Sequence, residues 1–96
     1  MSYVIVHTFP GGTEEQYRAA LAASRPGPDR LPAGQVLHYA GPSTAGWTIV
    51  AVHESKASWE TFRDETLRPL FDSGVPGAFA GPPEEIAFEP AAELSA

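Results

Sequence analysis

The chain has 96 residues, the size of one small domain. It has a net charge of −6 and no cysteine, which excludes disulfides and thiolate nucleophiles and argues against nucleic acid and anionic membrane surfaces as partners. It shows neither a signal-peptide pattern nor an apolar run of about 20 residues, so the expected location is cytoplasmic, with no membrane span.

Apolar periodicity divides the chain into six elements, in the order strand, helix, strand, strand, helix, strand. They cover residues 3–9, 13–24, 35–40, 48–52, 55–71 and 84–89, and residues 90–96 are expected to be a loose tail. The first helix starts with a capping-box pattern from Thr13 to Gln16, and Ser55 is the expected N-cap of the second. Pro69 cannot donate a hydrogen bond to the carbonyl of Glu65, so a kink or a tightened turn is expected there.

The element order βαββαβ predicts an α+β, ferredoxin-like sandwich, formed by residues 1–96 as a single domain. Its antiparallel four-stranded sheet would carry two helices on one face, with Ile86 and Phe88 of the last strand pointing inward. Both strand faces are apolar, with Val4, Val6, Val50 and Val52 on one and Ile5, Ile49 and Ala51 on the other. Because two helices cover only one face, the second face is expected to pack against the sheet of a second copy.

The segment VAVHESKASWETFRDETLRP, residues 50–69, is the strongest match to a known family, followed by YVIVHTF and TEEQY near the start. The chain resembles the dimeric α+β barrel superfamily, close to its antibiotic biosynthesis monooxygenase group. The resemblance implies a homodimer whose sheets pack face to face in a barrel, with a cavity between sheet and helices in each subunit. Enzymes of the group oxidise aromatic polyketide-type phenols to quinones without metal, flavin or other cofactor, because the substrate itself gives electrons to dioxygen.

The expected function is therefore that of a cofactor-free monooxygenase-like protein, an oxidoreductase acting on a small aromatic substrate. Two alternatives stay open, since fold alone does not choose a function. One is a non-catalytic dimeric module that binds a small hydrophobic ligand or assists another enzyme. The other is a cofactor-independent isomerase or cyclase. Haem-degrading relatives use a histidine late in the second helix, and residues 68–73 have none, which argues against that role.

Oxidation of a phenol needs a base, a donor for the oxyanion and an apolar pocket that excludes water. His7 takes the place of a cavity-facing polar residue that the family carries late in its first strand, and His53 ends the third strand. These two are the candidate catalytic bases, and each has a structural alternative as a hydrogen-bonded histidine at a strand end. The expected substrate-binding residues are Tyr3, His38, Tyr39, Trp47, Trp59, Phe62 and Phe79. No short histidine spacing suggests a metal site, so none is expected.

Overall fold

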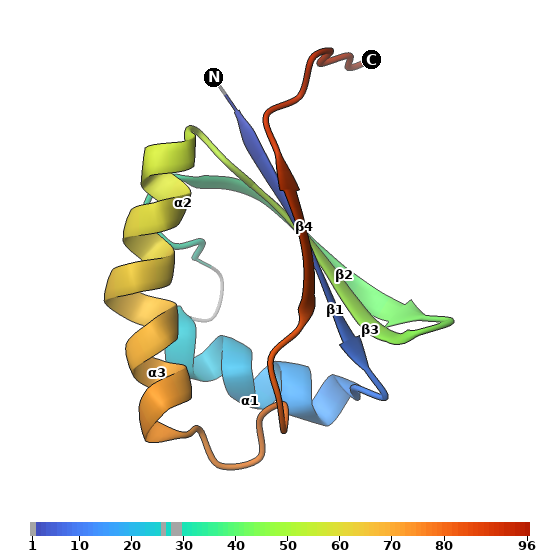
Figure 1. The fold of residues 1–96 in the computed structure, drawn as a ribbon, viewed down its shortest axis with the longest axis vertical. Helices are drawn as coiled ribbons and strands as arrows, with labels where there is room; N and C mark the ends of the chain where they lie inside the picture. The colour runs from blue at the N-terminus through green and yellow to red at the C-terminus, as the bar shows by residue number, and fades with distance from the viewer. Residues whose placement is uncertain (1, 26, 28–29) are drawn as a thin grey trace.

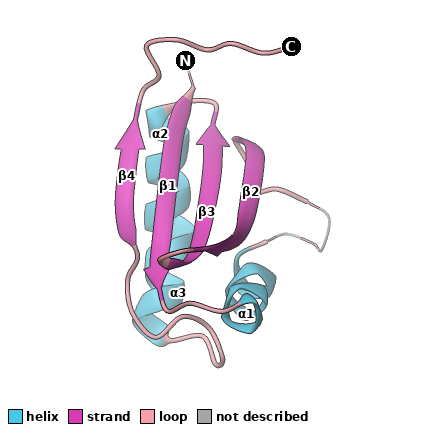
Figure 2. Cartoon of the chain, turned by 90° about the vertical axis from the view of Figure 1, so that its right-hand side faces the viewer, coloured by secondary structure: helices cyan, strands magenta, loops and turns pink. Residues whose placement is uncertain are grey.

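Four strands form one antiparallel sheet in the order β2-β3-β1-β4, and helices cover one of its faces (Figures 1 and 2). The computed structural model describes residues 2–25, 27 and 30–96. Its strands are β1 (Tyr3–Pro10), β2 (Gln35–Ser43), β3 (Gly46–His53) and β4 (Glu84–Phe88). Its helices are α1 (Glu14–Ser24), α2 (Lys56–Phe62) and α3 (Arg68–Ser73), with a π-helical segment, Arg63–Leu67, between the last two. The predicted ferredoxin-like α+β fold is confirmed.

Both predicted helix starts are confirmed by their hydrogen bonds. The Gln16 N–H donates to Thr13 Oγ1 at 3.2 Å, and the Thr13 N–H donates to Gln16 Oε1 at 3.0 Å, which completes the capping box. The Ser55 hydroxyl accepts the Ser58 N–H at 3.0 Å. The second cap fixes the corner where β3 turns into the long helix of residues 56–73.

The long helix widens just before Pro69. The Arg68 N–H donates to the carbonyl of Arg63, five residues back, where an α-helix would use the residue four back. A proline in a helix removes one N–H donor and crowds the carbonyl four residues before it. A π-type turn accommodates that conflict within a continuous helix. The turn is therefore widened, and the expectation of a tightened one is wrong.

The helices meet the sheet in different ways (Figures 1 and 2). The long helix follows the strands along one face, whereas α1 crosses beneath one end of the layer. Within the described residues, no helix combines the length and the apolar character needed to span a bilayer. The crosswise position of α1 lets the side chains of both helices face the same part of the sheet.

The inner face of the sheet carries the core. In the β1–β3 register Ile5 lies opposite Ala51, and Phe9 lies opposite Trp47. The buried hydrophobic residues are Ile5, Phe9, Tyr17, Trp47, Ala51 and Trp59. This core is small and largely aromatic, so single aromatic side chains account for much of the burial.

The outer face of the sheet is apolar and has no helix on it (Figure 2). The register places Val4, Val6, Leu37, Tyr39, Val50, Val52, Ile86 and Phe88 on this face. Tyr39, Ile86 and Phe88 expose 67%, 65% and 45% of their surface. The expectation that Ile86 and Phe88 point inward is wrong, because they pair with outward-facing valines of β1.

Candidate functional site

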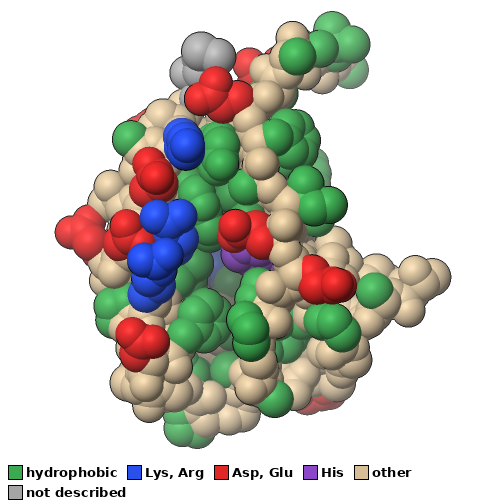
Figure 3. Space-filling view, viewed as in Figure 1, with side chains coloured by type: hydrophobic (Ala, Val, Ile, Leu, Met, Phe, Trp, Pro, Cys, Tyr) green, Lys and Arg blue, Asp and Glu red, His purple; other side chains and the backbone are tan. Residues whose placement is uncertain are grey.

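A cavity of about 100 Å³ lies between the inner face of the sheet, α1, the long helix and the loop of residues 74–83. One water needs roughly 10–15 Å³ by a similar measure, so the space exceeds that of a single water. Its walls are mainly apolar and aromatic. Figure 3 shows the surface hollowed between the long helix and β4, with histidine atoms at the bottom of the hollow beside acidic atoms.

His7 lines the cavity from the middle of β1 and is held there by Glu85 of β4. The two residues are register partners, and His7 Nε2 lies 2.7 Å from Glu85 Oε1. The His7 side chain is 16% exposed, and its ring packs edge-on against Trp59 at 5.7 Å between centroids. A carboxylate can only accept, so Nε2 donates and the neutral ring keeps its lone pair on Nδ1. The pair is an oriented base of the kind that general-base catalysis uses.

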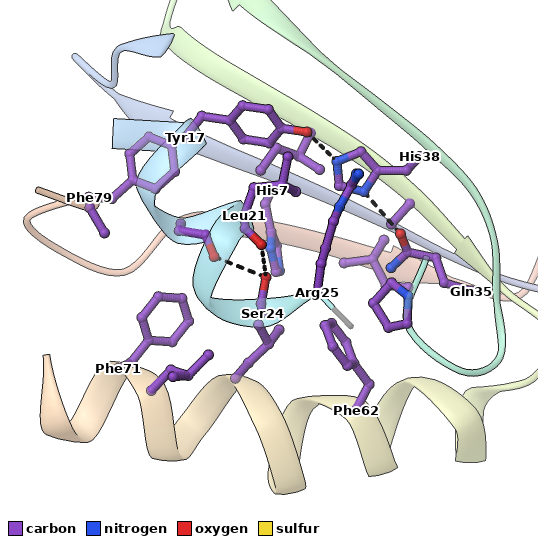
Figure 4. A pocket seen from close by; sticks show the side chains of 18 of the residues that line it. His7, Tyr17, Leu21, Ser24, Arg25, Gln35, His38, Phe62, Phe71 and Phe79 are labelled. Carbon is purple, nitrogen blue, oxygen red and sulfur yellow. Dashed lines mark hydrogen bonds between the residues drawn. The ribbon is translucent and has the colours of Figure 1, made fainter. Parts of the chain in front are cut away.

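A second histidine, His38 of β2, lines the cavity with Tyr17 of α1. The Tyr17 hydroxyl lies 2.7 Å from His38 Nε2, and His38 Nδ1 lies 3.0 Å from Gln35 Oε1. Because the amide oxygen accepts only, Nδ1 carries the hydrogen and Nε2 accepts from Tyr17. Figure 4 shows these hydrogen bonds at one end of the cavity.

The same chain of hydrogen bonds continues behind the cavity to the long helix. Gln35 Nε2 donates to His53 Nε2 at 3.2 Å, and His53 Nδ1 lies 3.0 Å from Ser58 Oγ. With Nε2 accepting, Nδ1 of the neutral His53 ring must donate to Ser58. All four bonds therefore run in one direction, from Tyr17 to Ser58, which satisfies the ring nitrogens of both histidines in their neutral form.

The environment favours these protonation states. Burial lowers the pKa of His38, and the positive charge of Arg25 lowers it further. Burial also lowers the pKa of His53, with Glu54 opposing the effect. Burial raises the pKa of Tyr17 against the pull of nearby arginines. Near pH 7 both rings are therefore neutral and Tyr17 keeps its proton.

Gln35 was missed by sequence reasoning because β2 contains a β-bulge. The β2–β3 register passes from Gln35 opposite His53 to Leu37 opposite Val52 and skips Val36, which is 59% exposed. The extra residue lets Gln35 and His38, three positions apart, face the same side. Strict alternation would have put them on opposite faces.

Five predicted site residues line the cavity, namely His7, His38, Trp59, Phe62 and Phe79. Phe79 stacks on Phe9, with ring centroids 3.7 Å apart and planes inclined by 9°. The loop of residues 74–83 thereby closes one end of the cavity. These five side chains supply two imidazoles and three aromatic walls.

The other four predicted residues do not line the cavity. His53, predicted as a catalytic base, is 0% exposed and has both ring nitrogens in the hydrogen-bond chain, so neither nitrogen is open to the cavity. Tyr39 lies on the outer face, and Tyr3 lies beside His53 at the end of β1. Trp47 packs against the ring of Tyr17, with the two ring centroids 5.1 Å apart. Among the described residues, no group of three or more His, Asp or Glu side chains could hold a metal ion.

Two solved structures share this fold over nearly the whole chain. Rv0793 from Mycobacterium tuberculosis has a TM-score of 0.65 to this chain at 19% identity, over 98% of each chain. The monooxygenase from the gene ActVA-Orf6 of Streptomyces coelicolor, in complex with the ligand Nanaomycin D, has a TM-score of 0.53 at 20% identity, over 99% of this chain and 91% of that one. No protein-family model and no curated protein matches the sequence. At these identities the likeness establishes the fold.

The lowered pKa values of His38 and His53 make the stability depend on pH. Their folded-state pKa values are lowered, so the unfolded chain binds more protons as pH falls below about 6.5. The free energy of unfolding should therefore be highest above that pH and decrease below it, by at most about 1.4 kcal/mol per pH unit for each histidine. Urea unfolding between about pH 8 and pH 5 measures this. His53→Gln should reduce the slope, and an equally steep slope in that variant would contradict the assignment.

Proposed function

We propose that the chain is a cofactor-independent monooxygenase that oxidises a small phenolic aromatic in the cavity. The observation that carries the proposal is His7, a histidine oriented by Glu85 inside an aromatic-walled cavity. One protein with this fold is a monooxygenase with Nanaomycin D bound, which supports the reaction class.

In this proposal His7 acts as the general base. Glu85 holds the Nε2–H, so the lone pair on Nδ1 takes the proton of the phenol. The carboxylate also stabilises the imidazolium that forms, as a charged acceptor does for a buried donor. The resulting phenolate is electron-rich and gives electrons to dioxygen. Trp59, Phe62 and Phe79 provide flat apolar surface for the ring and keep water away.

The reaction balances without an added reductant. A phenol and one O₂ give a quinone and one water, so one oxygen atom enters the ring and the other leaves as water. The two hydrogens of that water come from the phenolic O–H and from the ring carbon that becomes a carbonyl. The substrate supplies all the electrons, and His7 ends the cycle neutral.

Oxygen uptake with a dihydroxynaphthalene tests the proposal. The expected result is one O₂ consumed per hydroxynaphthoquinone formed, with no flavin, metal or reductant added, and one atom of labelled oxygen in the product. Failure to consume oxygen with this substrate and with a dihydroxyanthrone would contradict the proposal.

A second function is favoured by the presence of two proton-carrying pairs, His7–Glu85 and Tyr17–His38, on the same cavity. An isomerase or cyclase needs one group that removes a proton from the substrate and another that returns a proton to it. Such a reaction would proceed at full rate under strict anaerobiosis, whereas oxygenation would stop. If the aromatic compound binds tightly but is not converted under either aerobic or anaerobic conditions, the protein is instead a binding module.

We also propose a homodimer formed through the outer face of the sheet. Its apolar side chains are contiguous across all four strands, and patches of this kind on small proteins mark interfaces.

Sedimentation should give about twice the 10.2 kDa of one chain. Val50→Asp should weaken association at least about 100-fold, because it buries an unpaired charge at the interface. Ala22→Asp, on the exposed surface of α1, is the matched control and should stay dimeric. A wild-type monomer at micromolar concentration would overturn this proposal.

A further inference from the structure

Tyr17 forms a short hydrogen bond to a neutral base in the wall of the cavity (Figure 4). Its hydroxyl lies 2.7 Å from His38 Nε2, and the residue is only 6% exposed. His38 Nδ1 is held by Gln35 Oε1 at 3.0 Å, so the ring can take a proton on Nε2 and keep its other bond. The oxidation by His7 proposed above does not use this pair.

The geometry of the pair is the one that oxidation of a tyrosine by one electron requires. A phenol that loses an electron becomes a very strong acid, so the electron leaves readily only when a base takes the proton in the same step. Burial and the charge of Arg25 lower the pKa of His38, so its ring is neutral and its Nε2 lone pair accepts the Tyr17 hydrogen. Burial raises the pKa of Tyr17, which keeps that hydrogen in place. The proton has to move only along one hydrogen bond.

A second oxidisable ring lies against Tyr17 and lacks a base. The ring centroids of Trp47 and Tyr17 are 5.1 Å apart. Trp47 is 6% exposed, and no described residue accepts a hydrogen bond from its buried Nε1. A tryptophan that loses an electron and keeps its N–H proton is a cation, which an apolar environment disfavours. An electron vacancy on Trp47 would therefore move to Tyr17, where the proton can pass to His38.

The other two of the three tyrosines are placed differently. Tyr39 lies among the apolar side chains of the outer face and is 67% exposed. Tyr3 is the register partner of His53, but both nitrogens of that ring are already bonded, to Gln35 and Ser58. Tyr17 is thus the tyrosine that combines burial, the cavity and a base.

We propose that Tyr17 and His38 form a redox-active pair that reduces a peroxyl radical formed in the cavity. The Tyr17 ring gives one electron to the radical, and its O–H proton moves to His38 Nε2, so a neutral tyrosyl radical lies beside an imidazolium. The peroxyl radical becomes a peroxide anion, which takes a proton from the His7 imidazolium and forms a hydroperoxide. Loss of water from this hydroperoxide gives the quinone. The step transfers one electron and conserves charge.

The inference rests on the proposed function for the source of the radical and for the proton on His7. Electron transfer from the phenolate to dioxygen gives a phenoxyl radical and superoxide. If these separate, a second dioxygen adds to a ring carbon of the phenoxyl radical and forms the peroxyl radical. The released superoxide then resets the pair, because it gives its electron to the tyrosyl radical and becomes dioxygen, while the proton returns from His38 to Tyr17. The charge of Arg25 disfavours the imidazolium of His38 and so favours this return.

The other ionisable groups near the pair do not take the Tyr17 proton. His7 lines the same cavity, with Nε2 bonded to Glu85, but the Tyr17 hydrogen is directed at His38 Nε2. During turnover His7 carries the phenolic proton, so it donates to the peroxide and has no lone pair left for Tyr17. The arginines that act on Tyr17 are already cations and cannot accept a proton.

Photochemical oxidation tests the pair without substrate. The parent protein carries Tyr3→Phe and Tyr39→Phe, which leaves Tyr17 as its one tyrosine. A flash-generated ruthenium(III) tris(bipyridine) complex is the oxidant, and transient absorption and electron paramagnetic resonance detect the radical. The expected product is a neutral tyrosyl radical that forms more slowly in heavy water, because the proton moves with the electron. No tyrosyl signal, or equal rates in the two solvents, would overturn the inference.

His38→Gln separates the base from the hydrogen bond. The amide oxygen can still accept from Tyr17 but is not a base, so radical formation should slow by about 100-fold or more, as on loss of a positioned base. His53→Gln, further along the same chain of hydrogen bonds, is the matched control and should keep the parent rate. Far-UV circular dichroism checks the folding of each variant. A parent-like rate in His38→Gln, or equal losses in both variants, would contradict the role of His38.

The inference and the proposed function fail separately. During phenol oxidation Tyr17→Phe should release superoxide that the wild type consumes, measured as cytochrome c reduction that superoxide dismutase abolishes. Oxygenation with equal superoxide release by both proteins would leave the monooxygenase and remove the role of the pair. A photochemical tyrosyl radical that depends on His38, without oxygen uptake on any phenol, would leave the redox-active pair and remove the monooxygenase.

Discussion

Replacing His7 by Asn is expected to lower kcat/KM for phenol oxidation by about 100- to 10,000-fold, the range for loss of a general base. The side chain is partly exposed and lies at the edge of the core, so the fold should be retained. Asn keeps a donor for Glu85 but has no lone pair basic enough to take a phenolic proton. Initial rates of oxygen uptake with a dihydroxynaphthalene measure the loss, with far-UV circular dichroism as the check on folding.

The variant Glu85→Gln measures how much the carboxylate of Glu85 contributes to the activity of His7 as a base. An amide can still accept from Nε2 but no longer stabilises the imidazolium, so a loss of about 10- to 100-fold is expected. The matched control is Glu84→Gln, one residue earlier in β4 and on the opposite face of the strand. Wild-type oxygen uptake in His7→Asn, or equal losses in both glutamate variants, would show that His7 is not the base.

Local sequence rules were sufficient to predict the fold. The capping box at Thr13 and the N-cap at Ser55 mark both helix starts, and apolar alternation marks the strands. The crosswise position of α1 could not be predicted, because it depends on how its aromatic and small residues pack against the sheet. The π-turn before Pro69 follows from a backbone conflict that has several local solutions.

The candidate site was predicted where strand alternation holds and missed where it breaks. His7 and His38 face the cavity as the pattern indicates, whereas the bulge at Val36 brings Gln35 to the same side. Glu85 was missed because both sheet faces are apolar, so hydrophobicity alone did not tell which face of β4 meets the helices. His53 has the right residue type at a strand end, but only tertiary packing shows that it is fully buried.

The chain of hydrogen bonds shows how Gln35 and His53, whose positions the sequence did not predict, bear on function. Gln35 lines the cavity and accepts from His38 Nδ1, which fixes the tautomer of His38, whereas His53 lies behind the cavity and is hydrogen-bonded to Gln35. A sequence search for catalytic histidines cannot distinguish a base from a residue that orients another one. The difference lies in the number of ring nitrogens already used, which is two for His53.

Gly46→Ala is expected to destabilise the protein by about 3–5 kcal/mol, as backbone strain adds to steric overlap. Gly46 has a φ of +143°, which L-residues with a side chain rarely adopt. A Cβ there would lie 2.3 Å from the carbonyl oxygen of Phe9 and 2.5 Å from the nitrogen of Gly11. These are backbone atoms at the end of the β1–β3 ladder, where the Gly11 N–H donates to the Ala45 carbonyl at 3.1 Å, so they cannot yield as a side chain would.

Thermal unfolding measures the effect, with an expected decrease in Tm of about 15 °C or more for a domain of this size. Gly41→Ala is the matched control, because a Cβ at Gly41 meets no atom within 4 Å and its φ is not positive. That variant should stay within about 0.5 kcal/mol of wild type. A similar Tm for both variants would mean that β3 starts elsewhere than the structure places it.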